Sequence, residues 1–269
     1  MSRLPFTAFG VLVVATVAAF FITQHLKVAT PLLAGFPRPV PAGINPVSGT
    51  SCYDPAVGKT LDYRRMHISF YLLNQSDNVD VWVVNDRGQK VATLASGTYM
   101  RGGSQAARSY FSWNGFESNG ALAPDGVYYV QVHLVHQDRT VKISDSSGPI
   151  PFRIITTPPK PVVTLVAPHQ IHAARPAPVR VDFTGNGSRL ATVLIYRLNG
   201  QGKPVLVKSF ITGGRTTVWN GLIDKQPAAP GTYLIGLEVT DLACNTGRFP
   251  ASLAPLPPDA ATAEVTVLP

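Results

Sequence analysis

The sequence predicts an all-β protein: two tandem β-sandwich domains that follow an N-terminal transmembrane helix. The 24 prolines and 23 glycines among 269 residues favour short strands joined by turns over a helix bundle. A Trp-Asn-Gly motif and the strand after it occur twice, at a spacing typical of one sandwich domain. Charged residues make up 14% of the chain and hydrophobic residues 45%, a composition that favours a folded chain over a disordered one.

Residues 1–27 are predicted to be a single-pass signal-anchor helix. Residues 4–22 carry no charge, and a helix of that length spans about 28 Å, close to the thickness of the hydrocarbon core of a bilayer. A cleavable signal peptide is the alternative, because Thr16, Val17 and Ala18 form a small-residue cleavage site. A buried core helix fits less well, since the stretch has no polar face. We therefore expect a protein of the cell membrane, with its domains outside the cytoplasm.

Residues 28–44 contain four prolines and one charged side chain. Such a stretch is typical of a semi-rigid, extended spacer. We expect it to hold the following domains away from the membrane.

The rest of the chain contains an internal repeat. Trp113, Asn114 and Gly115, followed by Tyr128, correspond to a second Trp-Asn-Gly motif followed by Tyr233. The offset is 106 residues between the tryptophans and 105 between the tyrosines, which is the length of one β-sandwich domain. The proline-rich stretch 157–161 separates the copies, so the predicted domains are residues 45–157 and 158–269.

Each copy contains runs in which apolar and polar residues alternate, the pattern of strands with one buried face. Two such apolar faces, packed together, form the core of a sandwich. The predicted inward positions are Ile68, Phe70, Leu72, Val79, Val81, Val83, Tyr128, Val130, Val132 and Leu134 in the first copy, and Val179, Val181, Phe183, Val193, Ile195, Tyr233, Ile235, Leu237 and Val239 in the second.

Trp113, Trp219, Tyr128 and Tyr233 are predicted to be core residues rather than ligand contacts, because both copies place them beside a turn at a strand end. The turns themselves are predicted from residues that accept a positive φ or favour a reversal of the chain. These turn residues are Asn114, Gly115, Gly126, Asn220, Gly221 and Gly231.

The order of hydrophobic strand, Trp-Asn-Gly, loop, Pro-x-Gly or Pro-Gly-x-Tyr and alternating strand resembles the immunoglobulin-like domain of the flagellar hook-capping protein FlgD. Residues 79–94 look like the strand, turn and strand before the tryptophan in that family. The resemblance implies tandem immunoglobulin-like domains and exposure at a bacterial surface. It does not imply a flagellar task, because the chain has a membrane segment and lacks the hook-capping N-terminal region. Some family members have an acidic loop before the first strand; here it keeps only Asp54 and Asp62, so no calcium is expected.

No catalytic, cofactor-binding or metal-binding residues are predicted. The sequence contains no nucleophile-elbow, zinc-protease, paired-cysteine or phosphate-loop motif. His133 and His136 are three residues apart on an expected strand and would point to opposite faces. Asp241 and Asn245 are expected to stabilise a turn. We expect a protein that is not an enzyme.

The two cysteines, Cys52 and Cys244, have two interpretations. Outside the cytoplasm they could form a disulfide that clamps the two domains, with a stabilisation of roughly 5 kcal/mol in the chain-entropy model. The other interpretation is two unpaired thiols, since Cys52 would have to reach across the first domain.

Half of the net charge of +8 lies in the second domain, which has ten basic and six acidic side chains, against ten and nine in the first domain. Two interpretations are open: an ordinary basic surface, or attraction to an anionic wall polymer or lipid headgroups. Nucleic acid is not expected as a partner, because no recognition helix or basic-aromatic stretch is visible. The candidate polymer-binding residues are Arg180, Arg189, Arg197, Lys203, Lys208 and Arg215.

These observations favour a membrane-anchored, non-enzymatic protein of the bacterial cell envelope that acts as a spacer or as a docking module for another envelope protein. The alternatives are a binding module for an anionic or carbohydrate envelope polymer, and a non-catalytic accessory subunit of an envelope enzyme. The identity of the protein partner does not follow from the sequence.

Overall fold

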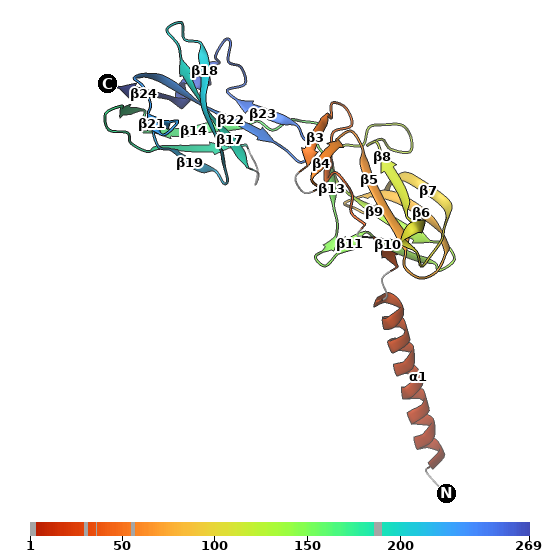
Figure 1. Ribbon diagram of the computed structural model, residues 1–269. Helices are drawn as coiled ribbons and strands as arrows, with labels where there is room; N and C mark the ends of the chain where they lie inside the picture. The colour runs from red at the N-terminus through yellow and green to blue at the C-terminus, as the bar shows by residue number, and fades with distance from the viewer. Residues whose placement is uncertain (1–3, 30–31, 36, 55–56, 186–189) are drawn as a thin grey trace.

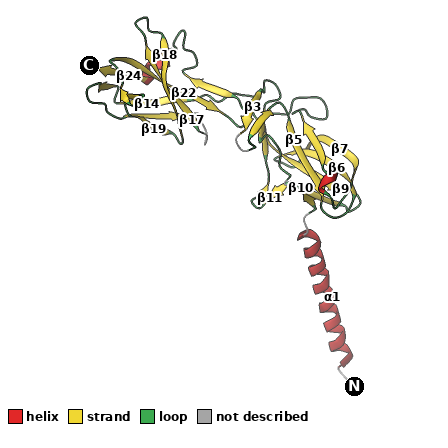
Figure 2. Ribbon diagram, viewed as in Figure 1, coloured by secondary structure: helices red, strands yellow, loops and turns green. Residues whose placement is uncertain are grey.

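The computed structural model consists of one long helix followed by two β-sandwiches, so the predicted all-β class is confirmed (Figure 1). The structure describes residues 4–29, 32–35, 37–54, 57–185 and 190–269. Helix α1 (Leu4–Ala29) stands away from both sandwiches, and the second sandwich lies farthest from it (Figures 1 and 2). Among the residues with described side chains, no helical stretch has both the length and the apolarity needed to cross a membrane.

The first domain is a two-layer sandwich with two small hairpins and a short 3-10 helix, η1. Its three-stranded sheet has the order β1 (Leu33–Ala34), β5 (Met66–Leu72), β8 (Ser109–Trp113). Its six-stranded sheet has the order β2 (Gly43–Ile44), β13 (Phe152–Ile154), β9 (Gly126–Leu134), β6 (Asp77–Asn85), β7 (Lys90–Met100), with β10 (Arg139–Lys142) also paired to β9. The hairpins are β3 (Ser51–Asp54) with β4 (Lys59–Asp62) and β11 (Ser144–Asp145) with β12 (Gly148–Pro149), and η1 spans Gln105–Ala107.

The second domain has the same plan. Its three-stranded sheet has the order β14 (Val162–Ala167), β16 (Val179–Thr184), β19 (Thr216–Trp219). Its six-stranded sheet has the order β15 (Gln170–His172), β24 (Glu264–Leu268), β22 (Gly231–Thr240), β17 (Ala191–Leu198), β18 (Pro204–Thr212), with β23 (Thr246–Phe249) also paired to β22. A hairpin of β20 (Leu222–Ile223) and β21 (Gln226–Pro227) and a 3-10 helix, η2 (Pro258–Ala263), complete it.

Each strand of the two sheets in one domain therefore has a counterpart in the other. The pairing direction also agrees: β2 with β13 and β15 with β24 are parallel, while the neighbouring pairs in both domains are antiparallel. The two domains are two copies of one strand arrangement.

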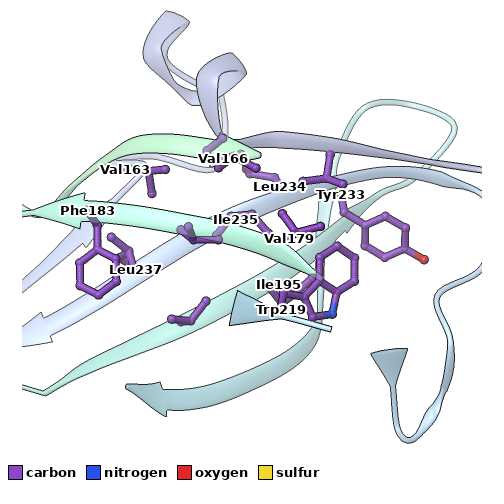
Figure 3. Close-up of a cluster of buried hydrophobic side chains, with 14 of the residues drawn as sticks. Val163, Val166, Val179, Phe183, Ile195, Trp219, Tyr233, Leu234, Ile235 and Leu237 are labelled. Atoms are coloured by element: carbon purple, nitrogen blue, oxygen red, sulfur yellow. The ribbon is translucent and has the colours of Figure 1, made fainter. Parts of the chain in front are cut away.

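The apolar residues that alternate along the strands lie between the two sheets of each domain. In the second domain these side chains meet around Trp219 and Tyr233 (Figure 3). Trp219 is 1% exposed, and its ring lies 5.4 Å from that of Tyr233. The inward positions predicted from the alternation are all buried in both domains.

Both aromatic pairs also use their polar atoms in the same way. The indole N–H groups of Trp113 and Trp219 donate to the carbonyl oxygens of Phe116, at 2.7 Å, and Leu222, at 3.1 Å. The hydroxyls of Tyr128 and Tyr233 donate to carbonyl oxygens four residues earlier, at 2.6 and 2.8 Å. Burial raises the pKa of both tyrosines, so the hydroxyls keep the proton that these bonds need.

One segment differs from the expectations. The stretch expected to be a spacer, residues 28–44, supplies β1 and β2 to the first domain, because extended apolar residues such as Ile44 can be buried at a sheet edge.

The predicted turn glycines fall into two groups. Gly115 and Gly221 have positive φ angles of 81° and 71°, as their predicted turns require. Gly126 and Gly231, expected in turns, are instead the first residues of β9 and β22.

Candidate functional site: the junction between the domains

The junction begins with the turn between β22 and β23. Asp241 holds this turn, because its carboxylate accepts hydrogen bonds from the backbone N–H groups of Ala243, at 2.8 Å, and Asn245, at 2.9 Å. Cys244 has a φ of 61°, a conformation that non-glycine residues seldom adopt. The turn thereby presents Leu242, Cys244 and Asn245 to the first domain.

The hairpin β3–β4 of the first domain meets this turn. Cys52 on β3 forms a disulfide with Cys244, across a Cα–Cα distance of 6.4 Å and 192 residues of sequence. The disulfide interpretation of the two cysteines is therefore the one found in the structure. It joins the two domains covalently in addition to the linker between Ile154 and Val162, which passes close by, since the carbonyl of Ile155 accepts a hydrogen bond from Asn245.

Beside the disulfide, two buried asparagines bond across the junction. The side-chain amide of Asn45 donates to the Oδ1 of Asn245 at 2.7 Å. The amide of Asn245 donates in turn to the carbonyl of Ile155, at 2.9 Å, and to the carboxylate of Asp241, at 2.8 Å. Asn45 is 0% exposed and Asn245 8% exposed. Buried amides that find partners on both domains specify one relative orientation, because another orientation would leave them unpaired.

The backbones also approach closely at the junction. A β-carbon on Gly43 would lie 2.8 Å from the carbonyl oxygen of Leu242, and one on Gly247 would collide with the carbonyl of Pro159. Glycine is therefore needed at position 43 for the domains to pack as they do, and at position 247 for the linker to pass β23.

A cleft of about 500 Å³ opens between the domains next to the disulfide. Tyr53 and Tyr63 line it from the first domain, and Leu190, Ile211 and Leu242 line it from the second. Its carboxylates have partners: Asp241 holds the turn, and Glu238 pairs with Arg248 at 2.6 Å. The described residues contain no group of three side chains able to hold a metal ion. The lining of the cleft thus combines apolar side chains with the carboxylates of Asp54, Glu238 and Asp241.

Five of the six candidate polymer-binding residues are described, and they lie on or beside both sheets of the second domain. Arg180 lies on the three-stranded sheet and pairs with Asp182 at 2.8 Å, an interaction that lowers the pKa of that carboxyl. On the other sheet, Arg197 donates to the carbonyl of Pro230 and Lys208 to that of Leu222. Lys203 and Arg215 are exposed, and Arg189 lies outside the described residues.

The fold defines the class: each domain is a two-layer β-sandwich with a tryptophan-tyrosine pair in its core. Residues 58–138 match the model of the FlgD Ig-like domain family, so the first domain contains a FlgD-type immunoglobulin-like domain. This agrees with the resemblance seen in the sequence, over a shorter span. No curated protein matches the chain.

Solved structures give weaker likenesses. Latent PorU from Porphyromonas gingivalis matches with 11% identity and a TM-score of 0.29, over 76% of this chain and 18% of that one. A marsupial T cell receptor matches with 10% identity and a TM-score of 0.28, over 66% and 63%. The plexin A4 extracellular region matches with 17% identity and a TM-score of 0.23, over 69% and 12%. This chain spans less than two thirds of each of these proteins.

Sequence reasoning missed Asn45 and the domain-bridging role of Asn245. Asn45 stands in the turn Asn-Pro-Val-Ser, where its Oδ1 accepts from the N–H groups of Val47, at 3.1 Å, and Ser48, at 3.0 Å. That turn is visible in the sequence, but its contact with a residue 200 positions away is not.

Proposed function

We propose that this protein is a membrane-anchored, extracytoplasmic spacer that carries a docking domain at a fixed distance and angle from the membrane. It is not an enzyme in this proposal, and its partner is another protein of the cell envelope. The second domain is proposed to be a FlgD-type domain as well, because its strand order repeats that of the first.

The observation that carries the proposal is the junction. Domains in one chain usually move relative to one another unless their interface is extensive. Here a disulfide and a buried pair of asparagines act together at one contact, and a separate linker also joins the domains. Two sandwiches fixed in this way form a rigid bent rod, which is what a spacer needs.

The helix supports the membrane anchor. All described side chains of α1, residues 9–21, are exposed. They include Phe9, Leu12, Val14 and Phe21, with between 65% and 69% exposure. A continuous apolar surface of this kind needs an apolar environment, and lipid would supply it. The disulfide supports a location outside the cytoplasm, because cytosolic thiols are kept reduced.

Fractionation of cells that express the full chain with a C-terminal tag tests the proposal. The wild type should remain in the membrane after alkaline carbonate extraction, and added protease should remove the tag from spheroplasts. The double variant Val13→Arg/Val17→Arg should be released, because a charged side chain at the centre of a span costs roughly 2.5–3.5 kcal/mol.

The matched control, Val13→Leu/Val17→Leu, should stay in the membrane. A soluble wild-type chain, a protected tag, or a mature mass that lacks the helix would each contradict the anchor.

A further inference from the structure

The six-stranded sheet of each domain ends in an edge strand, β7 in the first domain and β18 in the second. Because the two domains share one strand arrangement, β7 serves as an internal comparison for β18. An exposed edge strand can pair with a strand of another chain, and folded proteins usually obstruct such pairing.

Strand β7 is obstructed. Its pairing with β6 shifts register at three places, which twists the edge. The carbonyl of Val91 already accepts a hydrogen bond from the N–H of Ser118 at 3.0 Å. Thr93, Ser96 and Thr98 supply polar exposed side chains along the strand.

Strand β18 is more open. Its pairing with β17 shifts register at one place. Val205, Leu206 and Ile211 on this strand are 51%, 52% and 68% exposed, and Val218 on β19, the edge of the other sheet, is 52% exposed. The two edge strands of the second domain thus carry four exposed large apolar side chains, whereas the corresponding strands of the first domain carry two, Tyr99 on β7 and Tyr110 on β8.

The segment that contains β18 is basic, whereas the carboxylates of Asp54, Glu238 and Asp241 line the junction cleft beside Ile211. The sequence contains no Asp or Glu from residue 183 to residue 223, whereas it contains five Lys and Arg residues there. Lys203, just before β18, and Arg215, just before β19, are exposed. Two copies of this edge would repel one another, and a strand with carboxylates would be attracted.

The edge leads into the junction cleft. Ile211, near the end of β18, and Leu190, just before β17, both line the cleft of about 500 Å³. A strand added to β18 could therefore place one large apolar side chain in this cleft, at the end of the strand opposite Lys203.

We propose that β18 is the docking edge of the protein and that it binds an extended segment of another protein by β-strand addition. The segment runs antiparallel to β18, with a large apolar residue at its N-terminal end in the junction cleft. Its C-terminal end carries carboxylates beside Lys203. The inference rests on the proposed docking function and names its site and the chemistry of its partner.

A synthetic peptide tests the proposal with the full chain in detergent. The peptide is acetyl-Phe-Thr-Val-Thr-Val-Thr-Val-Glu-Glu-amide. It has nine residues, the same number as β18. The control peptide has the same sequence except that Lys-Lys replaces Glu-Glu at its C-terminal end. In fluorescence anisotropy the acidic peptide should bind at least tenfold tighter at low salt, and the difference should shrink at high salt as charges are screened.

The double variant Leu206→Glu/Ile211→Glu should weaken binding of the acidic peptide at least tenfold. These side chains are exposed, so the variant should keep the melting temperature of the wild type. The matched variant on the other edge, Thr93→Glu/Thr98→Glu, should bind like the wild type.

Equal binding of the two peptides, no binding of either, or equal loss in both variants would overturn the proposal. Self-association of the wild-type chain that the β18 variant abolishes would assign the edge to a second copy instead. The membrane fractionation is independent of these results, so a failed edge and a failed anchor can be distinguished.

Discussion

At the scale of single residues, the cores depend on one tryptophan in each domain. Trp219 is 1% exposed and donates its indole N–H to a carbonyl, so truncation removes both apolar burial and a hydrogen bond. Trp219→Ala should lower the free energy of unfolding of the second domain by about 3–5 kcal/mol, measured by chemical denaturation followed by circular dichroism. Trp82→Ala, a control at a half-buried outer position, should cost less. If the Trp219 variant melted at the same temperature as the wild type, the core role of Trp219 would be wrong, and the residue would have to be reassigned as a ligand contact.

Asp77 is a second residue with an unusual environment. It is 1% exposed, and its carboxylate accepts hydrogen bonds from the backbone N–H groups of His136, at 2.8 Å, and Gln137, at 3.2 Å. The His136 ring Nδ1 lies 2.8 Å from the same carboxylate. Burial alone would raise the pKa of Asp77, but these hydrogen bonds outweigh it and hold the pKa below its usual range.

This lowered pKa predicts a pH dependence of stability. The carboxylate binds protons less readily in the folded state, so its contribution is fully present above the unfolded-state pKa of about 3.9. It is lost as the pH falls through the lower folded-state pKa. Asp77→Asn should destabilise the first domain by about 1–3 kcal/mol at pH 7. Denaturation midpoints at a series of pH values should show the gap between wild type and variant closing in acid, and a constant gap would contradict this account.

At the scale of elements, the strands were predictable because strand patterning is local. The parity of a position decides whether Val81 or Trp82 faces the core, and parity can be seen in a short stretch of sequence. The repeat added the two Trp-Asn-Gly turns, whose glycines have the expected positive φ.

The hairpin β3–β4 shows where local patterns end. Its sequence keeps two acidic residues, Asp54 and Asp62, and contains no long alternating run. In the structure it extends to the second domain and brings Cys52 to Cys244. The contact between Asn45 and Asn245 likewise depends on how two folded domains meet. The sequence therefore left the Cys52–Cys244 disulfide as one of two interpretations and gave no sign of the asparagine contact, because no short stretch contains both partners.

At the scale of the whole molecule, the bent shape depends on two kinds of bond that act at one place. The disulfide limits how far the domains can separate, while the Asn45–Asn245 pair fixes their orientation. Because the asparagine pair sets the orientation, removal of the cysteines alone should leave the domains near their native angle. Removal of the buried amide as well should free them to rotate about the linker between Ile154 and Val162.

Distances between spin labels, introduced as non-canonical residues at Thr98 and Ser209, can measure this rotation. The wild type should give one narrow distribution, and Cys52→Ser/Cys244→Ser should broaden it slightly. Adding Asn245→Ala should broaden it strongly, because a buried Asn45 amide would then lack its partner across the junction. Adding Asn199→Ala instead, at a turn remote from the junction, should not. A broad distance distribution in the wild type would mean that the domains move freely. The proposed role as a rigid spacer would then be wrong, and the disulfide and the buried amides at the junction would need another explanation.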